Sequence, residues 1–331
     1  MAVTLRDVAD RAGVSVRTVS NVVNGFQYVS PGMREKVQAA LDELGYRPNL
    51  LARSLRQGRT GIVGLLVPDL AAPYFAELAH QVIAAARARG QTVLVDETGG
   101  DPQRERDALE VVTGSGRVDG VLFSALGLGG AHLADLRPQV PIVLLGERTA
   151  ELALDHVGID NVAAARDAVT HLVQRGCRRI GAIGGDRRGR GPTSVLRLQG
   201  WREACRAAGL PHPASLVGQA HAFTREEGHD AMRRLLAQEP DGVFCFNDTL
   251  ALGALRALQD AGRRTPDDVA VVGFDDIAEA RFSVPRLTTV HPDTEAITRE
   301  ALALLDRRLT GDGGPRRHLA IGHRLVVRES A

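Results

Sequence analysis

The sequence predicts a small all-α helix-turn-helix head followed by a larger α/β body of two lobes, each built on a parallel sheet. Three observations support this fold class. The first sixty residues carry amphipathic helical patterns separated by turn glycines. After Gly61, short runs of valine, leucine and isoleucine alternate with helical segments at the spacing of βαβ units. The same alternation restarts after Asp160-Asn161, so the body repeats one architecture twice.

The head begins with two short helices joined by a tight turn. Apolar residues recur at helical spacing over Leu5–Ala12, which predicts a first amphipathic helix. Gly13 tolerates positive φ where the chain must turn. Ser15 is a good N-cap for a second helix, in which Val19 faces the small residue Ala9. This order of small residue, turn glycine and β-branched residue is typical of a helix-turn-helix.

The second helix leaves an outer face whose N-terminal end would meet base edges in the major groove of DNA. We expect Val16, Arg17 and Asn21 to enter the groove, with Arg17 as the strongest candidate for a bidentate contact to guanine. The phosphates would contact Ser15, Thr18, Ser20 and Asn24.

Two further segments follow in the first sixty residues. A third helix begins at Ser30-Pro31 and ends at Gly45. The helix-competent segment 50–56 comes next, but it is too short to be stable alone.

Residues 1–60 carry a net charge of +4 and the remainder −3, so a basic head precedes a mildly acidic body. That layout favours a phosphate-binding head.

These motifs resemble a known family. The stretches TLRDVADRAGVS, TVS, REKVQAALDELGYRPN and LARSLR are similar to the DNA-binding head and hinge of LacI/GalR family transcriptional regulators. The resemblance implies a helix-turn-helix domain over 1–46, a hinge helix and linker over 47–60, and an effector-binding and dimerisation domain over 61–331. The last would be a periplasmic-binding-protein-like fold with a ligand cleft between an N-lobe (about 61–160 and 291–318) and a C-lobe (about 161–290 and 319–331).

The resemblance also gives the hinge a role. Residues 49–56 would fold as a helix only when two subunits meet on an operator. Leu55 would then wedge into the minor groove, and Ala52 would let the paired helices approach. The ordinary alternative is a frayed linker with Leu55 packed on the head. The full set of predicted DNA-contacting residues is Thr4, Ser15, Val16, Arg17, Thr18, Ser20, Asn21, Asn24, Tyr46, Asn49, Ala52 and Leu55.

The body pattern predicts its elements in order. The expected strands of the first lobe are 62–67, 92–95, 118–124, 141–145 and 157–159, with helices 73–89 and 102–113. The second lobe has expected strands 179–183, 215–219, 243–246 and 269–274, with helices 161–175, 193–208, 226–238 and 249–261. Strand 288–290, helix 294–309 and strand 324–328 would cross back between the lobes.

Ligands of open α/β sheets bind beyond the carboxyl ends of the strands. The residues at those positions combine carboxylates, an amide, arginines and aromatic rings, a mixture that suits a polyol. The predicted effector-binding residues are Asp69, Tyr74, Phe75, Arg148, Asp160, Arg197, Phe223, Asn247 and Asp275. The resemblance favours Arg197, Asn247 and Asp275 as effector contacts, and Phe75 and Phe223 as residues that stack on or enclose the ligand.

Several of these positions have structural alternatives. Asp248 is placed to cap the helix that follows it, and Asp276 to bridge locally. Tyr74 or Phe75 could belong to the core, and Trp201 to the core or the cleft floor.

Composition limits the function classes. With 44% hydrophobic and 24% charged residues among 331, the chain has the composition of an ordinary soluble globular protein. No apolar run approaches the ~20 residues of a membrane span, and residues 1–10 lack the apolar core of a signal peptide. The three cysteines have no metal-like spacing and fit a reducing, cytoplasmic compartment. We therefore expect a cytoplasmic protein without membrane partners, metal site or cofactor.

The sequence thus predicts a DNA-binding transcriptional regulator, a repressor whose operator affinity is modulated by a small carbohydrate. Its partners would be a pseudo-palindromic double-stranded DNA operator, the effector and a second copy in a homodimer, or further copies in a tetramer. A purine or nucleoside effector is the alternative within this class. An exported solute-binding protein is disfavoured by the basic head. An enzyme is disfavoured because no catalytic constellation stands at suggestive spacing and Gly184-Gly185 lacks phosphate-loop spacing.

Overall fold

The computed structural model describes residues 3–23, 26, 28–46, 59–129, 133, 139–146, 154–185 and 192–331. The chain divides into two compact units, Met1–Thr60 and Gly61–Ala331. The predicted hinge segment 49–56 lies outside the described residues. So do five predicted site residues, namely Asn24, Asn49, Ala52, Leu55 and Arg148.

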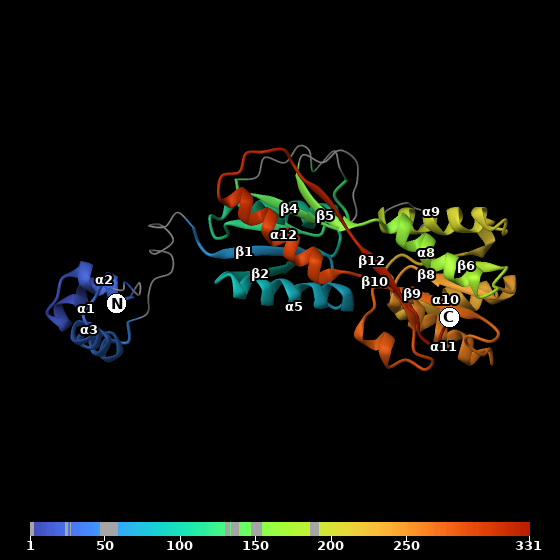
Figure 1. Cartoon of the computed structure of the whole chain (residues 1–331), viewed down its shortest axis with the longest axis horizontal. Helices are drawn as coiled ribbons and strands as arrows, with labels where there is room; N and C mark the ends of the chain where they lie inside the picture. Colours follow the sequence, from blue (N-terminus) through green and yellow to red (C-terminus); the bar gives the residue numbers. More distant parts are fainter. Residues whose placement is uncertain are drawn as a thin grey trace. The chain divides into compact units, whose positions relative to one another are not determined.

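The first unit is built on three helices, α1 (Leu5–Ala12), α2 (Val16–Val23) and α3 (Pro31–Leu44) (Figure 1). α1 starts in a capping box, because the Thr4 hydroxyl accepts from the Asp7 amide and the Asp7 carboxylate accepts from the Thr4 amide at 2.7 Å. These bonds lower the pKa of Asp7. The helix ends at Gly13, whose φ of 59° gives the turn that the sequence predicted. The Ser15 hydroxyl then accepts from the Thr18 amide at 3.1 Å and caps α2.

The three helices of the head enclose a small apolar core. Val8, Val19 and Val37 are fully buried, one from each helix, and Ala9 is only 2% exposed. A unit of this size has little apolar surface to bury, so each core position carries much of its stability.

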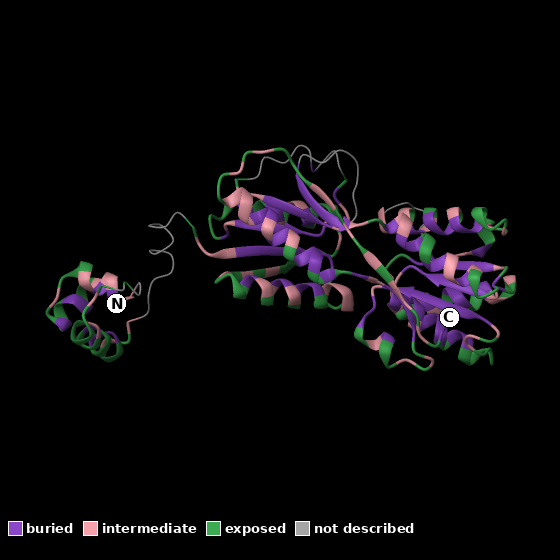
Figure 2. Ribbon diagram, in the orientation of Figure 1, coloured by how far each residue is buried: buried purple, intermediate pink, exposed green. Residues whose placement is uncertain are grey.

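The first sheet of the body has the strand order β11-β5-β4-β3-β1-β2, and all its pairs are parallel. Its strands are β1 (Ile62–Val67), β2 (Thr92–Glu97), β3 (Gly120–Phe123), β4 (Ile142–Leu145), β5 (Asp155–Ile159) and β11 (His318–Ile321). Helices α5 (Pro73–Ala88) and α12 (Thr294–Leu309) pack on one face, and α6 (Pro102–Gly114) packs on the other. Figure 2 shows the largely buried strands β1, β3, β4 and β5 between helices with exposed outer faces.

The second sheet has the order β12-β10-β9-β8-β6-β7. Its strands are β6 (Ile180–Gly185), β7 (Val217–Gln219), β8 (Gly242–Cys245), β9 (Ala270–Phe274), β10 (Thr288–Pro292) and β12 (His323–Val326). The helix pair α8 (Asn161–Gln174) and α9 (Pro192–Ala207) lies on one side, and α10 (Arg225–Leu235) with α11 (Asp248–Asp260) on the other (Figure 1). Short 3-10 turns follow at Ala214–Leu216, Leu236–Gln238 and Ala278–Arg281. β12 pairs antiparallel with β10, so this sheet is not wholly parallel as predicted.

Trp201 on α9 belongs to the core of the second lobe. It is fully buried, and its indole N–H donates to the carbonyl oxygen of Ile180 at 3.3 Å. The residue is not part of the cleft floor.

Three segments of the described chain connect the two sheets, after β5, after β10 and between β11 and β12. The connection between β11 and β12 lies a few residues beyond 318–319, where the sequence predicted the boundary between the lobes. β11 was not expected from the sequence, and it pairs with β5 in the first sheet. The final crossing therefore occurs at Gly322.

A buried ion pair attaches this C-terminal segment to the first sheet. The fully buried Asp155 carboxylate accepts from Arg308 Nε at 2.6 Å, from Arg308 Nη2 at 2.9 Å and from the Arg317 amide at 2.8 Å. Burial alone would raise the pKa of Asp155, but these hydrogen bonds and the nearby guanidinium groups lower it below 3.8. The carboxylate thus stabilises the fold in its ionised form.

We expect Asp155→Asn to lower the free energy of unfolding by about 3–5 kcal/mol at neutral pH, because Arg308 would lose its buried counter-charge. The stabilisation from a depressed carboxyl pKa is present above 3.8 and is lost as the pH falls through the lowered value, so the two proteins should converge in acid. Denaturation at a series of pH values measures both effects. Asp306→Asn is the control, because Asp306 pairs with Arg89 where both side chains are partly exposed. It should lower the free energy of unfolding by roughly 0–1 kcal/mol. Equal losses in the two variants would contradict a special role for Asp155.

Candidate functional site

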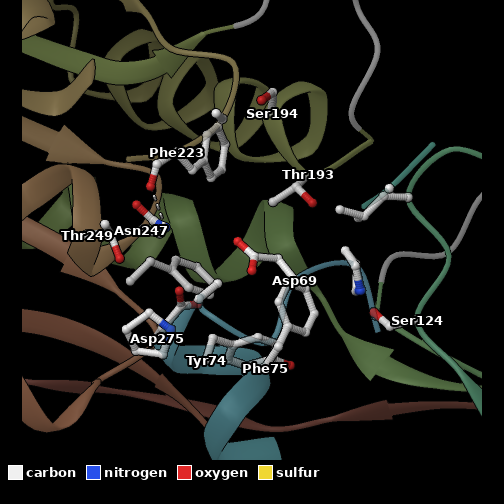
Figure 3. A pocket seen from close by; sticks show the side chains of 18 of the residues that line it. Asp69, Tyr74, Phe75, Ser124, Thr193, Ser194, Phe223, Asn247, Thr249 and Asp275 are labelled. Atoms are coloured by element: carbon white, nitrogen blue, oxygen red, sulfur yellow. Dashed lines mark hydrogen bonds between the residues drawn. The ribbon is translucent and has the colours of Figure 1, made fainter. Parts of the chain in front are cut away.

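A cleft of about 810 Å³ lies between the two lobes at the carboxyl ends of their strands (Figure 3). This is the edge at which open α/β sheets bind ligands. The predicted effector residues that line it are Asp69, Tyr74, Phe75, Arg197, Phe223, Asn247 and Asp275. The sheet topology therefore gathers side chains that are separated by as many as 206 positions in the sequence, from Asp69 to Asp275.

Arg197 on α9 forms a fixed cation at the base of the cleft, with only 7% of the residue exposed. Its Nε donates to Asn161 Oδ1 at 2.8 Å, and Nη1 donates to the carbonyl oxygen of Phe246. The guanidinium carbon lies 3.4 Å from the centre of the Phe274 ring, a cation–π contact. Nη1 also lies 3.9 Å from Asp275 Oδ1. Contacts on several sides hold this donor group in one orientation.

Asn247 and Phe223 are held together on the second lobe. Asn247 is the N-cap of α11, since its Oδ1 accepts from the Leu250 amide at 2.8 Å. Its Nδ2 donates to the carbonyl oxygen of Phe223 at 3.5 Å, the bond drawn in Figure 3. Phe223 has a φ of 57°, which is unusual for an aromatic residue. The alternative that Asp248 caps α11 is wrong, because the cap is the residue before it.

Asp275 and Asp276 form a strained turn directly after β9. Their φ angles are 110° and 54°, in a region that non-glycine residues rarely adopt. Asp275 lines the cleft. The Asp276 carboxylate instead accepts from Arg328 Nη2 at 2.6 Å and from His291 Nδ1 at 3.1 Å, so it forms the local bridge that was its alternative.

The first lobe contributes an aromatic wall. Tyr74 and Phe75, at the start of α5, meet edge to face with ring centres 5.1 Å apart. Both rings line the cleft and also pack against the core of the first lobe. Each residue is therefore placed to contact a ligand and also contributes to the core. Asp69 follows β1 and lines the cleft, and in the view of Figure 3 its carboxylate lies between these rings and Thr193.

The structure does not bring Asp160 into the cleft. This exposed residue is the N-cap of α8, and its Oδ1 accepts from the Ala163 amide at 2.9 Å. The next residue, Asn161, lines the cleft and holds Arg197. Sequence reasoning also missed several polar lining residues, namely Glu97, Ser124, Thr193, Ser194, His221 and Thr249. Glu97 and Ser124 stand at or just after strand ends, so the strand-end rule would have found them with correct strand limits.

The family described as bacterial regulatory proteins, lacI family, matches residues 4–49, and the periplasmic binding protein-like domain matches residues 169–331. The HTH-type transcriptional regulator CelR of Thermobifida fusca is 40% identical over 343 residues, covering 99% of this chain and 98% of the relative. The chain belongs to the LacI family. This confirms the resemblance of its head and the fold class of its body.

Two other comparisons agree with this LacI-family assignment. The HTH-type transcriptional repressor PurR of Haemophilus influenzae (strain PittEE) is 34% identical over 99% of this chain and 98% of its own. A solved structure of the CelR–cellobiose complex superposes with a TM-score of 0.73 at 37% identity, over 99% of this chain and 100% of the other. LacI-family proteins are non-enzymatic, DNA-binding regulators of transcription that respond to small molecules, and this chain is one of them.

The LacI-family head presents its predicted base-reading residues on α2. Val16 is 43% exposed, Arg17 is exposed and Asn21 is half-buried, all on the helix that follows the turn. Next to these residues, the hydroxyl oxygens of Ser15 and Thr18 lie 2.8 Å apart and share a hydrogen bond. Thr4 is occupied in the capping box of α1, and Tyr46 packs against the head core, so both also serve the fold.

No helix among the described residues is both long and apolar enough to span a membrane. The same residues contain no group of three or more His, Cys, Asp or Glu side chains arranged to hold a metal ion.

Proposed function

We propose that this LacI-family protein is a repressor whose operator affinity changes when a small carbohydrate binds between the lobes. The observation that carries the proposal is the combination of a fixed polar base with aromatic walls. Arg197, Asn247 and Asp275 offer forked donors and acceptors for vicinal hydroxyls. Phe75 and Phe223 offer flat apolar surfaces for the C–H faces of a sugar ring.

Size and charge support an uncharged ligand larger than a single small ring. The cleft of about 810 Å³ lies near the upper end of the ~300–1,000 Å³ typical of ligand pockets. Among the described charged residues that line it, four are acidic (Asp69, Glu97, Glu226 and Asp275) and two are basic (Arg197 and Arg225). The relative CelR was solved in complex with cellobiose. We therefore infer a neutral oligosaccharide as the effector.

A purine or nucleoside is the second candidate for the effector. An arginine, a carboxylate and a phenylalanine can also hold a base, by hydrogen bonds to its edge and stacking on its face.

The head would bind DNA as one half of a homodimer. One small helix-turn-helix covers a half-site, so specificity calls for two heads on a pseudo-palindromic operator. Effector in the cleft would change the arrangement of the lobes and hence the operator affinity, by a coupling that is typically about 1–3 kcal/mol.

Calorimetric titration of the full chain against cellobiose, glucose, adenosine and hypoxanthine tests the effector class. We expect cellobiose to bind, and to change the affinity for an operator selected from random duplexes. Binding of adenosine or hypoxanthine alone would favour the purine alternative. A protein that prefers no duplex over random DNA would contradict the whole proposal.

Arg17→Ala tests the recognition helix. Loss of a bidentate contact to guanine should reduce discrimination by about 1–3 kcal/mol in each half-site, while binding to scrambled DNA changes little. Competition binding at one fixed salt concentration measures both. Arg11→Ala removes a head arginine that instead pairs with Glu43 at 2.6 Å, and it should leave discrimination unchanged. Equal effects of the two substitutions would exclude the proposed role of Arg17.

A further inference from the structure

A fully buried carboxylate lies directly behind the cleft. Asp248 is the first residue of α11 and follows the cap residue Asn247. Its Oδ1 lies 2.5 Å from the hydroxyl of Thr289, and its Oδ2 accepts from the Ile277 amide at 2.9 Å. Asp248 does not line the cleft and is not exposed. Neither contact with a ligand nor contact with solvent therefore explains why a carboxylate occupies this position.

These two bonds join three separate elements. Asp248 lies on α11, Thr289 lies on β10, and Ile277 closes the turn that follows β9. The packing is shaped around the carboxylate, because a Cβ placed on Gly273 would lie only 2.1 Å from Asp248 Oδ1. Asp248 therefore fills a space that the neighbouring strand leaves for it.

Asp248 supports the turn after β9, whose backbone is strained. Asp275 and Asp276 have φ angles of 110° and 54°, and strained conformations persist only where surrounding contacts hold them. The Asp275 amide donates to the carbonyl oxygen of Val290 at 2.8 Å, and the Asp276 carboxylate accepts from His291 at 3.1 Å. With the Thr289 contact of Asp248, the turn is attached to three successive residues of β10.

We propose that Asp248 is a positioning residue for effector binding. It fixes the turn that carries Asp275 to the start of α11, which carries Asn247, so that both side chains face the ligand at a constant separation. The inference rests on the proposed effector site.

The protonation state of Asp248 provides a measurable test of its positioning role. Burial raises the pKa of Asp248 well above its usual value, and the negative charges of Asp275 and Asp276 raise it further. In the protonated form, Oδ1 donates to the Thr289 hydroxyl, which can pass its own hydrogen to the Val290 carbonyl oxygen at 3.4 Å. An asparagine amide has the same shape and can make the same two bonds, with N–H in place of O–H.

The test compares full-length wild type with Asp248→Asn, Asp248→Ala and Thr289→Val, using cellobiose as the probe. Asp248→Ala should weaken cellobiose binding by about 5- to 100-fold, because the Ile277 amide and the Thr289 hydroxyl lose their partner. Thr289→Val should weaken binding in the same direction. Asp248→Asn should retain the wild-type affinity.

A pH series separates positioning from general destabilisation. Wild-type cellobiose affinity should fall as the pH rises through the raised pKa of Asp248, because ionisation places a buried negative charge beside the carboxylates of Asp275 and Asp276. That added fall should be absent from Asp248→Asn. The other ionisable groups facing Asp248 are Asp275, Asp276 and the buried Cys245 thiol, and both proteins contain all three.

Ser330→Ala is the matched control. The Ser330 hydroxyl is fully buried in the same lobe and bonds to the Thr288 amide at 2.8 Å and the Val271 carbonyl oxygen at 2.6 Å, away from the turn. It should cost stability without weakening cellobiose binding. Hydrogen exchange of the Ile277 amide, which needs no effector, should accelerate in Asp248→Ala and not in Ser330→Ala.

Equal cellobiose affinity and equal Ile277 exchange in Asp248→Ala and Ser330→Ala would overturn the positioning role. If Asp248→Ala does not fold, Thr289→Val and the pH series decide in its place. If wild type binds no cellobiose, the carbohydrate proposal fails, and Ile277 exchange alone decides whether Asp248 holds the turn.

Discussion

Arg197→Ala is expected to abolish the response to effector while operator binding survives. The substitution removes the guanidinium that contacts Asn161, Phe246 and Phe274, and it leaves the Asp275 carboxylate, only 10% exposed, without its nearby cation. Breaking such a buried pair costs about 3–5 kcal/mol, which corresponds to roughly 10²- to 4 × 10³-fold in binding if the loss falls on the ligand. Calorimetry with cellobiose and operator binding with and without cellobiose measure the two properties separately.

Arg166→Ala provides the comparison on the same lobe. Arg166 pairs with Glu203 at 3.6 Å, and its side chain is 47% exposed, so its removal should change neither property. If Arg197→Ala still responded to cellobiose like the wild type, the effector site would have to lie elsewhere.

Val19→Asp is expected to remove sequence-specific DNA binding completely. Val19 is fully buried in the small core of the head, where an aspartate would have no partner. The cost of several kcal/mol is comparable with the whole stability of so small a unit. Because the head and the body form separate compact units, cellobiose binding by the body should persist. Competition binding to operator and scrambled duplexes, with calorimetry in parallel, gives both results.

The same substitution at an exposed apolar position serves as its control. Val111 on α6 of the body is 69% exposed, and Val111→Asp should leave both DNA and cellobiose binding intact. Specific operator binding by Val19→Asp would show that the head does not depend on this core.

Elements with strong apolar patterns and clear end signals could be predicted from the sequence. α1, β1 and α12 have the limits that their patterns indicated. β11 could not be predicted, because it is four residues long, follows a segment of glycine and arginine, and is only partly buried. Its strand conformation depends on β5, which is far away in the sequence.

The candidate site was predictable to within one residue at two helix starts. Asp160-Asn161 and Asn247-Asp248 each follow a strand, and either member of each pair can cap a helix. The structure makes the first member the cap in both pairs, which sends Asn161 into the cleft and Asp248 into the core. The backbone strain at Asp275 had no sequence signal, because aspartate gives no indication of a φ of 110°.

The single residue between β11 and β12 limits how the lobes can move. Gly322 joins strands of two different sheets, so this strap has no slack with which to lengthen. Opening of the cleft must therefore be a pivot about the connecting segments, absorbed by backbone torsions at and beside Gly322, and the lobes cannot slide apart. A Cβ added at Gly322 would meet no atom within 4 Å, so the short length of the strap, and not crowding at this position, limits the motion, and an alanine there would preserve that limit.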